Sequence, residues 1–374
     1  MEELYIKKLS LVNFKNYEEV SLEFSPRINC FVGDNGMGKT NLLDAIHYLS
    51  LTKSFFNSVD QQNIRHGQEV FVIQGEFVRG ESTEKIYCSV RAGRKKICKR
   101  NNKDYERFSD HVGLLPVVMI SPADSALILE GSEQRRRFLD TVISLYDRRY
   151  LQALLRYNRA LQQRNKLLKQ IEFKGERTFD ELELWDVQLT GPGKEIFAKR
   201  QEMVEKLVPV FQSYYDEISG GRERIGLEYR SQLQEKRFEE LLAANREKDR
   251  VLQYTTAGIH KDDLVMTLDG HPIKKVGSQG QQKTFLVALK FAKFGFIRDL
   301  KGIKPILLLD DIFDKFDANR VYQIIRLVAR HEFGQIFITD TDADHLKGIL
   351  KELDTDHRIF RIDGKVTVMT QEKE

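Results

Sequence analysis

The eight residues from Gly33 to Thr40 constrain the fold of this chain more than any other segment. They read G-D-N-G-M-G-K-T and follow the short apolar run Ile28 to Val32, which predicts a buried strand, while Asn41 to Leu51 has the pattern of a helix. A glycine-rich turn between a strand and a helix presents successive backbone N–H groups to a phosphate. The segment therefore predicts a phosphate-binding loop inside an α/β fold.

Each residue type in this loop has a physical task. The glycines let the backbone wrap around the phosphates, Lys39 reaches the β- and γ-phosphates, and Thr40 binds Mg²⁺. ATP and Mg²⁺ are therefore the expected cofactors. The residues expected to contact ATP in this segment are Gly33, Asp34, Asn35, Gly36, Met37, Gly38, Lys39, Thr40 and Asn41.

A second motif is the apolar run Ile306 to Leu309, which predicts a buried parallel strand and is followed by two acids. Together with a phosphate loop, Asp310 is expected to complete the Mg²⁺ site with Thr40. Asp311 stands where a carboxylate orients the water that attacks the γ-phosphate. Lys39, Asp310 and Asp311 are the predicted catalytic residues.

A third motif, Gly277–Lys283, is a polar glycine turn that precedes the helical pattern Thr284 to Ile297. Its place before the two acids resembles the signature loop of ABC-type ATPases. In that loop a serine and a helix N-terminus contact the γ-phosphate of ATP bound by the opposite subunit. A plain glycine cap at the start of a helix is the alternative interpretation.

The signature-loop resemblance implies a homodimer in which two chains pack head to tail around two ATP molecules. ATP binding would then drive dimerisation, and hydrolysis would release the dimer. The signature residues expected at the nucleotide are Ser278, Gly280 and Gln281. Asp317 resembles the residue of the loop that crosses the dimer seam.

The remaining pattern predicts a helical insertion within an α/β domain. Leu4 to Val12 and Glu18 to Phe24 alternate as strands, and Glu69 to Ile97 alternates as two or three more. Residues 134–172 and 178–218 have helical spacing and predict two antiparallel helices, the second broken at Gly191-Pro192-Gly193.

Further elements complete this pattern: a strand at Ile225 to Arg230, a helix near Phe238 to Glu247, and alternating strands and helices from Lys261 onward. We therefore predict an ATPase head formed by residues 1–120 and 250–374. Residues 121–249 are predicted to form a mainly helical second lobe.

Composition excludes several other classes of protein. No apolar run approaches the length of a membrane span, and the N-terminal residues lack the apolar stretch of a secretory signal, so we expect a cytoplasmic protein without membrane contact. The three cysteines form no C-x-x-C pair, which argues against a disulfide framework or a zinc knuckle.

The net charge of +4 is too small to indicate nucleic acid binding by itself, but basic residues cluster locally. The segment Arg91 to Arg107 holds eight Lys or Arg residues against two acids, and the segment Glu133 to Glu172 is also basic. Either could follow a DNA backbone, and a solvated surface is the alternative. The candidate DNA contacts are Arg94, Lys95, Lys96, Lys99, Arg100, Arg148 and Arg149.

The order of these motifs resembles the SMC-like branch of the ABC ATPases, and the short insertion excludes a cohesin-type coiled coil. Within that branch the chain resembles the RecF family. The segments that carry the resemblance are Leu9–Tyr17, Ser121–Asp124, Arg135–Asp140, Gly258–Leu264, Ser278–Lys283 and Leu309–Asp311. Through the first of them, the resemblance adds Lys15 and Asn16 to the expected nucleotide contacts.

The RecF resemblance implies an ATP-dependent dimer that clamps duplex DNA near gaps or single-strand/double-strand junctions. Such a protein acts in recombinational repair, replication-fork restart and the SOS response to DNA damage, and helps RecO and RecR load RecA. The implied activity is a weak, DNA-stimulated ATPase in which slow hydrolysis times the clamp.

The chain departs from the usual patterns at three places. ABC ATPases usually have a His after the strand equivalent to Gln335–Thr339, where this chain has Asp340, and the family commonly has Arg where this chain has Phe56. No glutamine of the ABC lobe-joining loop is found near Ile120–Ala123.

Two other functional interpretations are considered. One is a nucleotide-bound scaffold with negligible turnover. The other is a metabolic kinase with a phosphate loop, which is disfavoured because it leaves the Gly277–Lys283 loop and the basic segments without a role. His260 is expected to be a structural rather than a catalytic residue.

Overall fold

The computed structural model describes residues 1–170, 177–313, 316, 318–329, 333–342, 346, 348, 350 and 356–369, and it excludes the side chains of residues 177–180, 318 and 329. The predicted seam residue Asp317 lies outside these ranges. The chain divides into two compact units. The first unit is Met1–Asp124, Glu217–Ser219 and Leu286–Glu374, and the second is Ser125–Asp216 and Gly220–Phe285.

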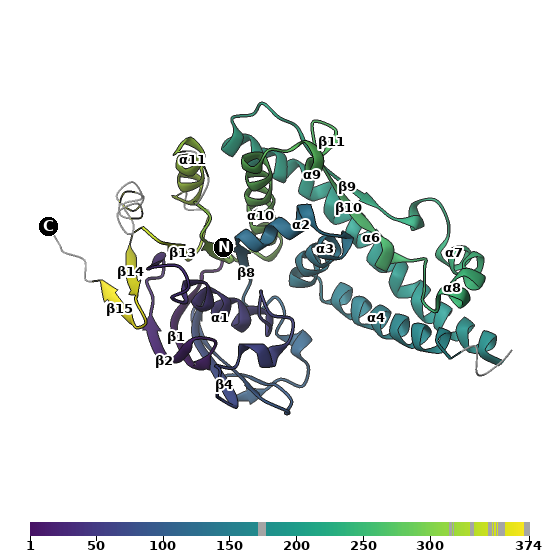
Figure 1. The fold of residues 1–374 in the computed structure, drawn as a ribbon, viewed down its shortest axis with the longest axis horizontal. Helices are drawn as coiled ribbons and strands as arrows, with labels where there is room; N and C mark the ends of the chain where they lie inside the picture. The colour runs from purple at the N-terminus through teal and green to yellow at the C-terminus, as the bar shows by residue number, and fades with distance from the viewer. Residues whose placement is uncertain are drawn as a thin grey trace. The chain divides into compact units, whose positions relative to one another are not determined.

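The first unit contains two six-stranded sheets (Figure 1). One is antiparallel, in the order β2-β1-β4-β5-β6-β7, and the other has the order β15-β14-β3-β13-β12-β8. The elements are β1 Leu4–Phe14, β2 Tyr17–Glu23, β3 Ile28–Val32, α1 Lys39–Leu51, β4 Val70–Arg79, β5 Ser82–Arg91, β6 Ile97–Arg100, β7 Lys103–Asp104, β8 Val117–Ile120, β12 Ile306–Asp310, α11 Ala318–Ala329, β13 Ile336–Asp340, β14 His357–Ile362 and β15 Val366–Met369.

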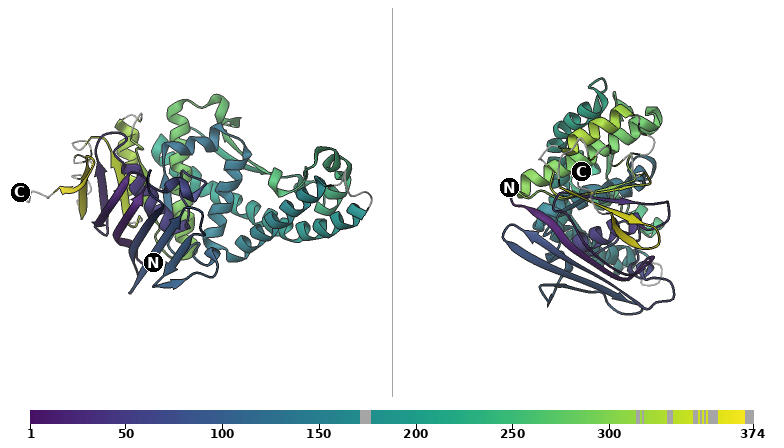
Figure 2. Two further views of the ribbon diagram at one scale, coloured as in Figure 1. Left: turned by 60° about the horizontal axis from the view of Figure 1, so that its bottom comes forward. Right: turned by 90° about the vertical axis from the view of Figure 1, so that its left-hand side faces the viewer.

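Helix α1 contacts both sheets of this unit, and the core forms around it. In Figure 2 the two sheets are seen as separate layers. Leu42, Ile46 and Leu49 of α1 are fully buried in one cluster with Phe71 of the antiparallel sheet and Leu308 of the other. Burial of these apolar side chains removes them from water and stabilises the packing of α1 between the sheets.

Five neighbouring strands of the second sheet, β8, β12, β13, β3 and β14, run parallel, and only β15 is antiparallel to its neighbour. The strands β3, β12 and β13 are buried at every position, which suits their continuous apolar runs. Parallel strands end at the same edge, so the segments that follow β3, β8, β12 and β13 meet there. The predicted strands near residues 4–12, 18–24 and 28–32 are thus confirmed.

The second unit combines helices with a three-stranded sheet in the order β11-β10-β9. Its elements are α2 Ala126–Leu129, α3 Ser132–Tyr146, α4 Arg148–Leu168, α6 Arg177–Ser219, β9 Ile225–Arg230, α7 Phe238–Ala244, α8 Arg246–Leu252, β10 Asp263–Leu268, β11 His271–Pro272, α9 Ile273–Val276 and α10 Gln279–Lys301. Helix α6 ends, and α10 continues, in residues of the first unit. None of the described helices combines the length and the apolar character that a membrane span requires.

The extent of the second unit differs from the predicted lobe of residues 121–249. Strand β10 pairs with β9 along its whole length, from Asp263 opposite Arg230 to Leu268 opposite Ile225. This pairing places β10 in the second unit, which extends to Phe285. Strand β10 pairs with the earlier strand β9 and is therefore part of the same unit, although the segment between them is mainly helical.

The predicted single helix over residues 134–172 is wrong, because the chain forms α3 and α4 with a break at Asp147. Asp147 has extended backbone angles, φ −118° and ψ 100°, and its carboxylate accepts a hydrogen bond from the Tyr150 N–H at 2.9 Å. This is an N-cap, in which a short acidic side chain replaces a missing helical acceptor. Similarly, the helix expected near residues 238–247 forms two short helices, α7 and α8.

The predicted break at Gly191-Pro192-Gly193 is also wrong, because α6 continues through both Pro192 and Pro209. Gly193 serves close packing. A Cβ at this position would lie 2.4 Å from a ring carbon of Phe238 and 3.3 Å from the ring of Tyr157. By contrast, a Cβ at Gly191 would meet no atom within 4 Å.

Buried ion pairs hold the second unit together. Arg200, almost fully buried, contacts Asp140 at 2.9 Å and Asp262 at 3.0 Å, and burial raises the pKa of Asp262. His260 contacts the Tyr157 hydroxyl at 2.8 Å and the Thr255 carbonyl oxygen at 2.9 Å, and burial lowers its pKa to about 4. These contacts give His260 the structural role that was expected.

Candidate nucleotide-binding site

The phosphate loop follows β3 and leads into α1 through backbone that only glycine accommodates. Gly38 has φ +107°, and a Cβ there would lie 2.3 Å from the side-chain amide of Asn16. At Gly33 a Cβ would lie 2.1 Å from the carbonyl oxygen of Ile362. The loop can therefore approach its neighbours, and a ligand, more closely than any chain with side chains at these positions.

The N-terminus of α1 fits an anionic group. Its N-cap is Gly38, no side chain caps the helix, and no acid lies in the first turn. The first N–H groups of a helix lack intrahelical partners and carry a partial positive charge. Asp34, Asn35, Gly36 and Met37 of the preceding loop are exposed to solvent, so a phosphate can reach these N–H groups.

Lys39 lies across the loop. Its Nζ donates to the carbonyl oxygens of Gly33, at 2.5 Å, and Asp34, at 2.9 Å. Burial lowers the pKa of Lys39, and the neighbouring carboxylates of Asp311 and Asp310 oppose this shift. The ammonium group thus binds the phosphate loop and lies within the electrostatic influence of Asp310 and Asp311.

The two predicted metal ligands, 270 residues apart in the chain, meet directly. The Thr40 hydroxyl donates to Asp310 Oδ1 at 2.8 Å. The Thr339 hydroxyl donates to the same oxygen at 3.0 Å, and the Ser121 hydroxyl lies 3.4 Å from Asp310 Oδ2. Burial raises the pKa of Asp310, while hydrogen bonds from Thr40 and Thr339 counteract the rise.

This oxygen-only set fits Mg²⁺, which prefers a few hydroxyl and carboxylate oxygens and completes its shell with phosphate oxygens and water. Among the residues that the structure describes, no group of three or more His, Cys, Asp or Glu side chains forms a metal cage.

Asp311 adopts a left-handed backbone conformation with φ +48°, which is unusual for a residue other than glycine. Its N–H donates to the Thr339 hydroxyl at 2.9 Å, so the same threonine holds both acids that end β12. Asp340 stands at the end of β13 and accepts a hydrogen bond from the Asp342 N–H at 2.9 Å. Where ABC ATPases usually have a histidine, this chain therefore has a carboxylate that accepts a hydrogen bond from the backbone of the following loop.

The three remaining nucleotide candidates near the loop have different surroundings. Asn16 donates to the Met37 carbonyl oxygen at 3.0 Å and accepts from Asn41 at 2.7 Å, so both asparagines lie at the phosphate loop. The Lys15 ammonium lies 2.6 Å from the fully buried carboxylate of Asp44 on α1. The structure thus gives Lys15 a partner inside the protein.

The predicted signature loop belongs to the second unit and starts α10. The Ser278 N–H donates to Gln281 Oε1 at 2.7 Å, and the Gln281 N–H donates to Ser278 Oγ at 3.2 Å. This reciprocal pair is a capping box. The Gln281 amide also donates to Glu223 at 2.6 Å. The cap of α10 is therefore Ser278, and Gly280 lies within the first turn of the helix.

The basic candidates for DNA contact divide into two groups. Lys96 has only 15% of its side chain exposed; it pairs with Asp60 at 2.9 Å and donates to the Thr52 carbonyl oxygen. These contacts give Lys96 partners within the first unit. Lys99 and Arg100 pair with Asp104 and Glu84, respectively. Arg94, Lys95, Arg148 and Arg149 are exposed, the last two at the start of α4.

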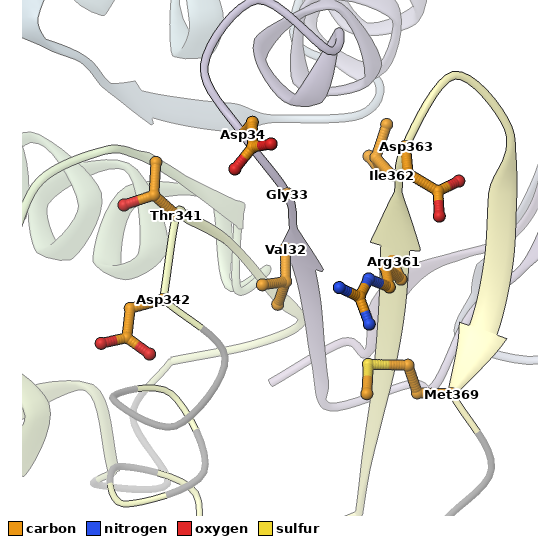
Figure 3. A pocket seen from close by; sticks show the side chains of 9 residues that line it. All are labelled: Val32, Gly33, Asp34, Thr341, Asp342, Arg361, Ile362, Asp363 and Met369. Atoms are coloured by element: carbon orange, nitrogen blue, oxygen red, sulfur yellow. The ribbon is translucent and has the colours of Figure 1, made fainter.

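A cavity of about 330 Å³ lies beside the phosphate loop, at the carboxyl ends of β3, β13 and β14 (Figure 3). Its lining residues are Val32, Gly33, Asp34, Thr341, Asp342, Arg361, Ile362, Asp363 and Met369. Sequence reasoning did not identify Arg361, Thr339 or Ser121 as neighbours of the site. Ser121 could have been noticed, since it opens one of the segments that resemble the RecF family.

Comparison with known proteins gives matches along almost the whole chain. The family model described as RecF/RecN/SMC N terminal domain matches residues 5–366. The DNA replication and repair protein RecF of Bacteroides thetaiotaomicron is 52% identical over 365 residues, which cover 97% of this chain and 98% of that protein. The RecF protein of Flavobacterium johnsoniae is 49% identical over 359 residues, with 96% and 100% covered.

Solved structures agree with these matches. A structure of the recombination mediator protein RecF-ATP in the RecFOR pathway superposes with a TM-score of 0.89 at 30% identity and covers 98% of each chain. An Smc head domain from Pyrococcus furiosus superposes with a TM-score of 0.58 at 18% identity, covering 99% of this chain and 97% of that one. The second likeness shows that the fold is that of an SMC-type ATPase head.

Proposed function

This chain belongs to the RecF family of DNA replication and repair proteins, and on that premise we propose that it is an ATP-dependent DNA clamp of recombinational repair. Two copies would close on duplex DNA near a gap or a single-strand/double-strand junction when they bind ATP. The single observation that carries the proposal is the contact of Thr40 with Asp310 beside the phosphate loop, at 2.8 Å.

The roles of the residues follow from their positions. The loop N–H groups and Lys39 would bind the triphosphate, and Thr40 with Asp310 would hold Mg²⁺. Bound Mg²⁺ supplies the charge that offsets the developing negative charge on the phosphates. Asp311, held by Thr339, would orient the attacking water. Ser278 of a second copy would contact the γ-phosphate, since it stands at the N-terminus of α10, where the helix carries a partial positive charge.

We expect ATP hydrolysis by this chain to be slow. Asp340 accepts the Asp342 N–H and offers no donor to a γ-phosphate at the place where ABC ATPases usually have histidine. This same observation favours the second candidate, a nucleotide-bound scaffold with negligible turnover. A DNA-stimulated release of phosphate distinguishes the clamp from the scaffold.

The proposed partners are duplex DNA with its junctions, RecR together with RecO, and indirectly RecA, in the cytoplasm. The solved relative is described as part of the RecFOR pathway, which supports the recombination-mediator partners. The exposed basic residues Arg94, Lys95, Arg148 and Arg149 are the proposed DNA contacts. DNA affinity should then fall steeply with salt, with a slope of log K near 0.9 per neutralised phosphate.

Sedimentation velocity with ATP or ADP, with and without a gapped duplex, tests the proposal. We expect a dimer with ATP only. Asp311→Asn should accumulate the dimer on DNA while phosphate release falls by about 100-fold or more. Ser278→Arg should bind ATP as a monomer but form no dimer, because bulk and charge would meet the γ-phosphate of the second copy.

Several results would contradict this function. A Ser278→Arg variant that still dimerises with ATP rules out the shared nucleotide site. A wild-type chain that releases no phosphate under any DNA condition leaves the scaffold as the better description. DNA binding that does not respond to salt argues against contact with the phosphate backbone.

A further inference from the structure

A buried ion pair joins α10 to the segment that follows β8. Lys290 Nζ lies 2.5 Å from Asp124 Oδ1, and each side chain is only 6% exposed. The same Nζ donates to the Met119 carbonyl oxygen at 3.0 Å. Both residues belong to the first unit, and neither was among the residues predicted to serve the site.

The acid of this pair holds Ser121 in place. Asp124 Oδ2 accepts a hydrogen bond from the Ser121 N–H at 2.9 Å, and the Asp124 N–H donates to the Ser121 carbonyl oxygen at 2.9 Å. Two backbone contacts with one residue fix both the position and the orientation of Ser121. Since the other oxygen of Asp124 is bound to Lys290, the carboxylate is itself held in one orientation.

Ser121 then reaches the proposed metal ligand. Its hydroxyl lies 3.4 Å from Asp310 Oδ2, whereas Asp310 Oδ1 receives the hydroxyls of Thr40 and Thr339. Among the residues that the structure describes, only Ser121 donates a hydrogen bond to Asp310 Oδ2.

From these contacts we propose that Lys290 is a positioning residue for Mg²⁺ binding, acting on Asp310 through Asp124 and Ser121. The proposal deepens the function proposed above and rests on it. Ser121 also takes the place where no glutamine of the ABC lobe-joining loop was found.

The position of Lys290 gives this arrangement a consequence for regulation. Helix α10 runs without interruption from Gln279, beside the proposed signature serine, to Lys301. The helix that would contact the nucleotide of a second copy therefore also carries the lysine that orients the metal ligand of its own copy. A displacement of α10 on dimerisation would change the affinity of this site for its metal.

The test measures metal binding directly, without relying on turnover. Mn²⁺ replaces Mg²⁺ at oxygen sites, and the signal of free Mn²⁺ in electron paramagnetic resonance reports its affinity for the full chain loaded with ADP. Partners that orient a metal ligand typically change metal affinity by about 10- to 100-fold. We expect Lys290→Met to weaken Mn²⁺ binding by about that factor, and Lys290→Arg to weaken it less.

Lys293→Met is the matched control. Lys293 lies about one turn further along the same helix and is also buried, with 7% exposed, but within the described part of the chain it forms no hydrogen bond or ion pair. Its replacement removes a comparable buried side chain and should leave Mn²⁺ affinity close to that of the wild type. Equal losses in Lys293→Met and Lys290→Met would overturn the proposal.

Ser121→Ala tests the last contact without disturbing the ion pair, so it applies even if Lys290→Met does not fold. It should weaken Mn²⁺ binding by about 10-fold or more, and Lys290→Met should add little to this loss in the double variant. The positioning role is refuted if the losses of Mn²⁺ affinity in Ser121→Ala and Lys290→Met add fully in the double variant. It is also refuted if Ser121→Ala binds Mn²⁺ as tightly as the wild type. A wild-type chain that binds neither ATP nor Mn²⁺ with ADP would instead refute the proposed function itself.

Discussion

Replacement of Lys15 by methionine tests whether the ion pair between Lys15 and Asp44 stabilises the first unit. Methionine has a similar length and no charge, so the change removes the ion pair and little volume. The Asp44 carboxylate, fully buried, would lose its contact with the Lys15 ammonium at 2.6 Å. It would keep the hydrogen bonds from the Ser54 hydroxyl at 2.6 Å and the Phe55 N–H at 2.7 Å.

Removal of one partner from a buried ion pair costs about 3–5 kcal/mol, because the other charge stays buried. Because Asp44 keeps two hydrogen bonds, we expect Lys15→Met to lower the free energy of unfolding by about 3 kcal/mol, the lower end of this range. The first unit has roughly 200 residues, for which each kcal/mol shifts Tm by about 2–4 °C. We therefore expect Lys15→Met to lower the Tm of this unit by about 6–12 °C.

Differential scanning calorimetry without nucleotide is the assay, so that any contact between Lys15 and ATP makes no contribution. Lys7→Met is the control, since Lys7 is exposed on the same strand and should change stability by no more than about 0.5 kcal/mol. The double variant Lys15→Met/Asp44→Asn should recover most of the loss. The neutral amide can still accept the Phe55 N–H and can donate to Ser54.

Two results would refute this reasoning. A decrease in Tm below about 2 °C for Lys15→Met would mean that Asp44 does not depend on the ammonium. A double variant with the summed losses of its two single variants would mean that the two side chains are not energetically coupled.

Two further predictions concern stability. Gly193→Ala should destabilise the second unit by about 1–3 kcal/mol, because its Cβ would overlap the Phe238 ring. Gly191→Ala, whose Cβ meets no neighbouring atom, should instead stabilise the helix by up to about 1 kcal/mol. Equal urea midpoints for the two variants would contradict the packing argument. Burial lowers the pKa of His47 to about 4, below its ordinary 6.5, so the unfolded chain takes up this proton first. Stability should therefore be lost as pH falls from 6.5 towards 4, by about 3 kcal/mol for this group, and His47→Gln should flatten the measured pH dependence by that amount.

The parts of the site that lie close together in the chain could be predicted from the sequence. The strand, loop and helix of residues 28–51 depend on neighbouring residues, since glycines, a lysine and a threonine at fixed spacing specify both the backbone and its ligand. The acids after β12 were predicted for the same reason, as was the fold class. Helix caps were predicted less well: Asp147 ends one helix and begins the next through a contact that composition does not reveal.

The contacts between distant segments were decided only by the tertiary structure. The sequence suggested that Thr40 and Asp310 share a metal, but their contact depends on β13 pairing between β3 and β12. The partners of Lys15, Lys96 and Lys290 could not be predicted at all. Identical lysines bind solvent, DNA or a buried acid according to which surfaces pack against them, and that packing is set by the burial of apolar side chains throughout the chain.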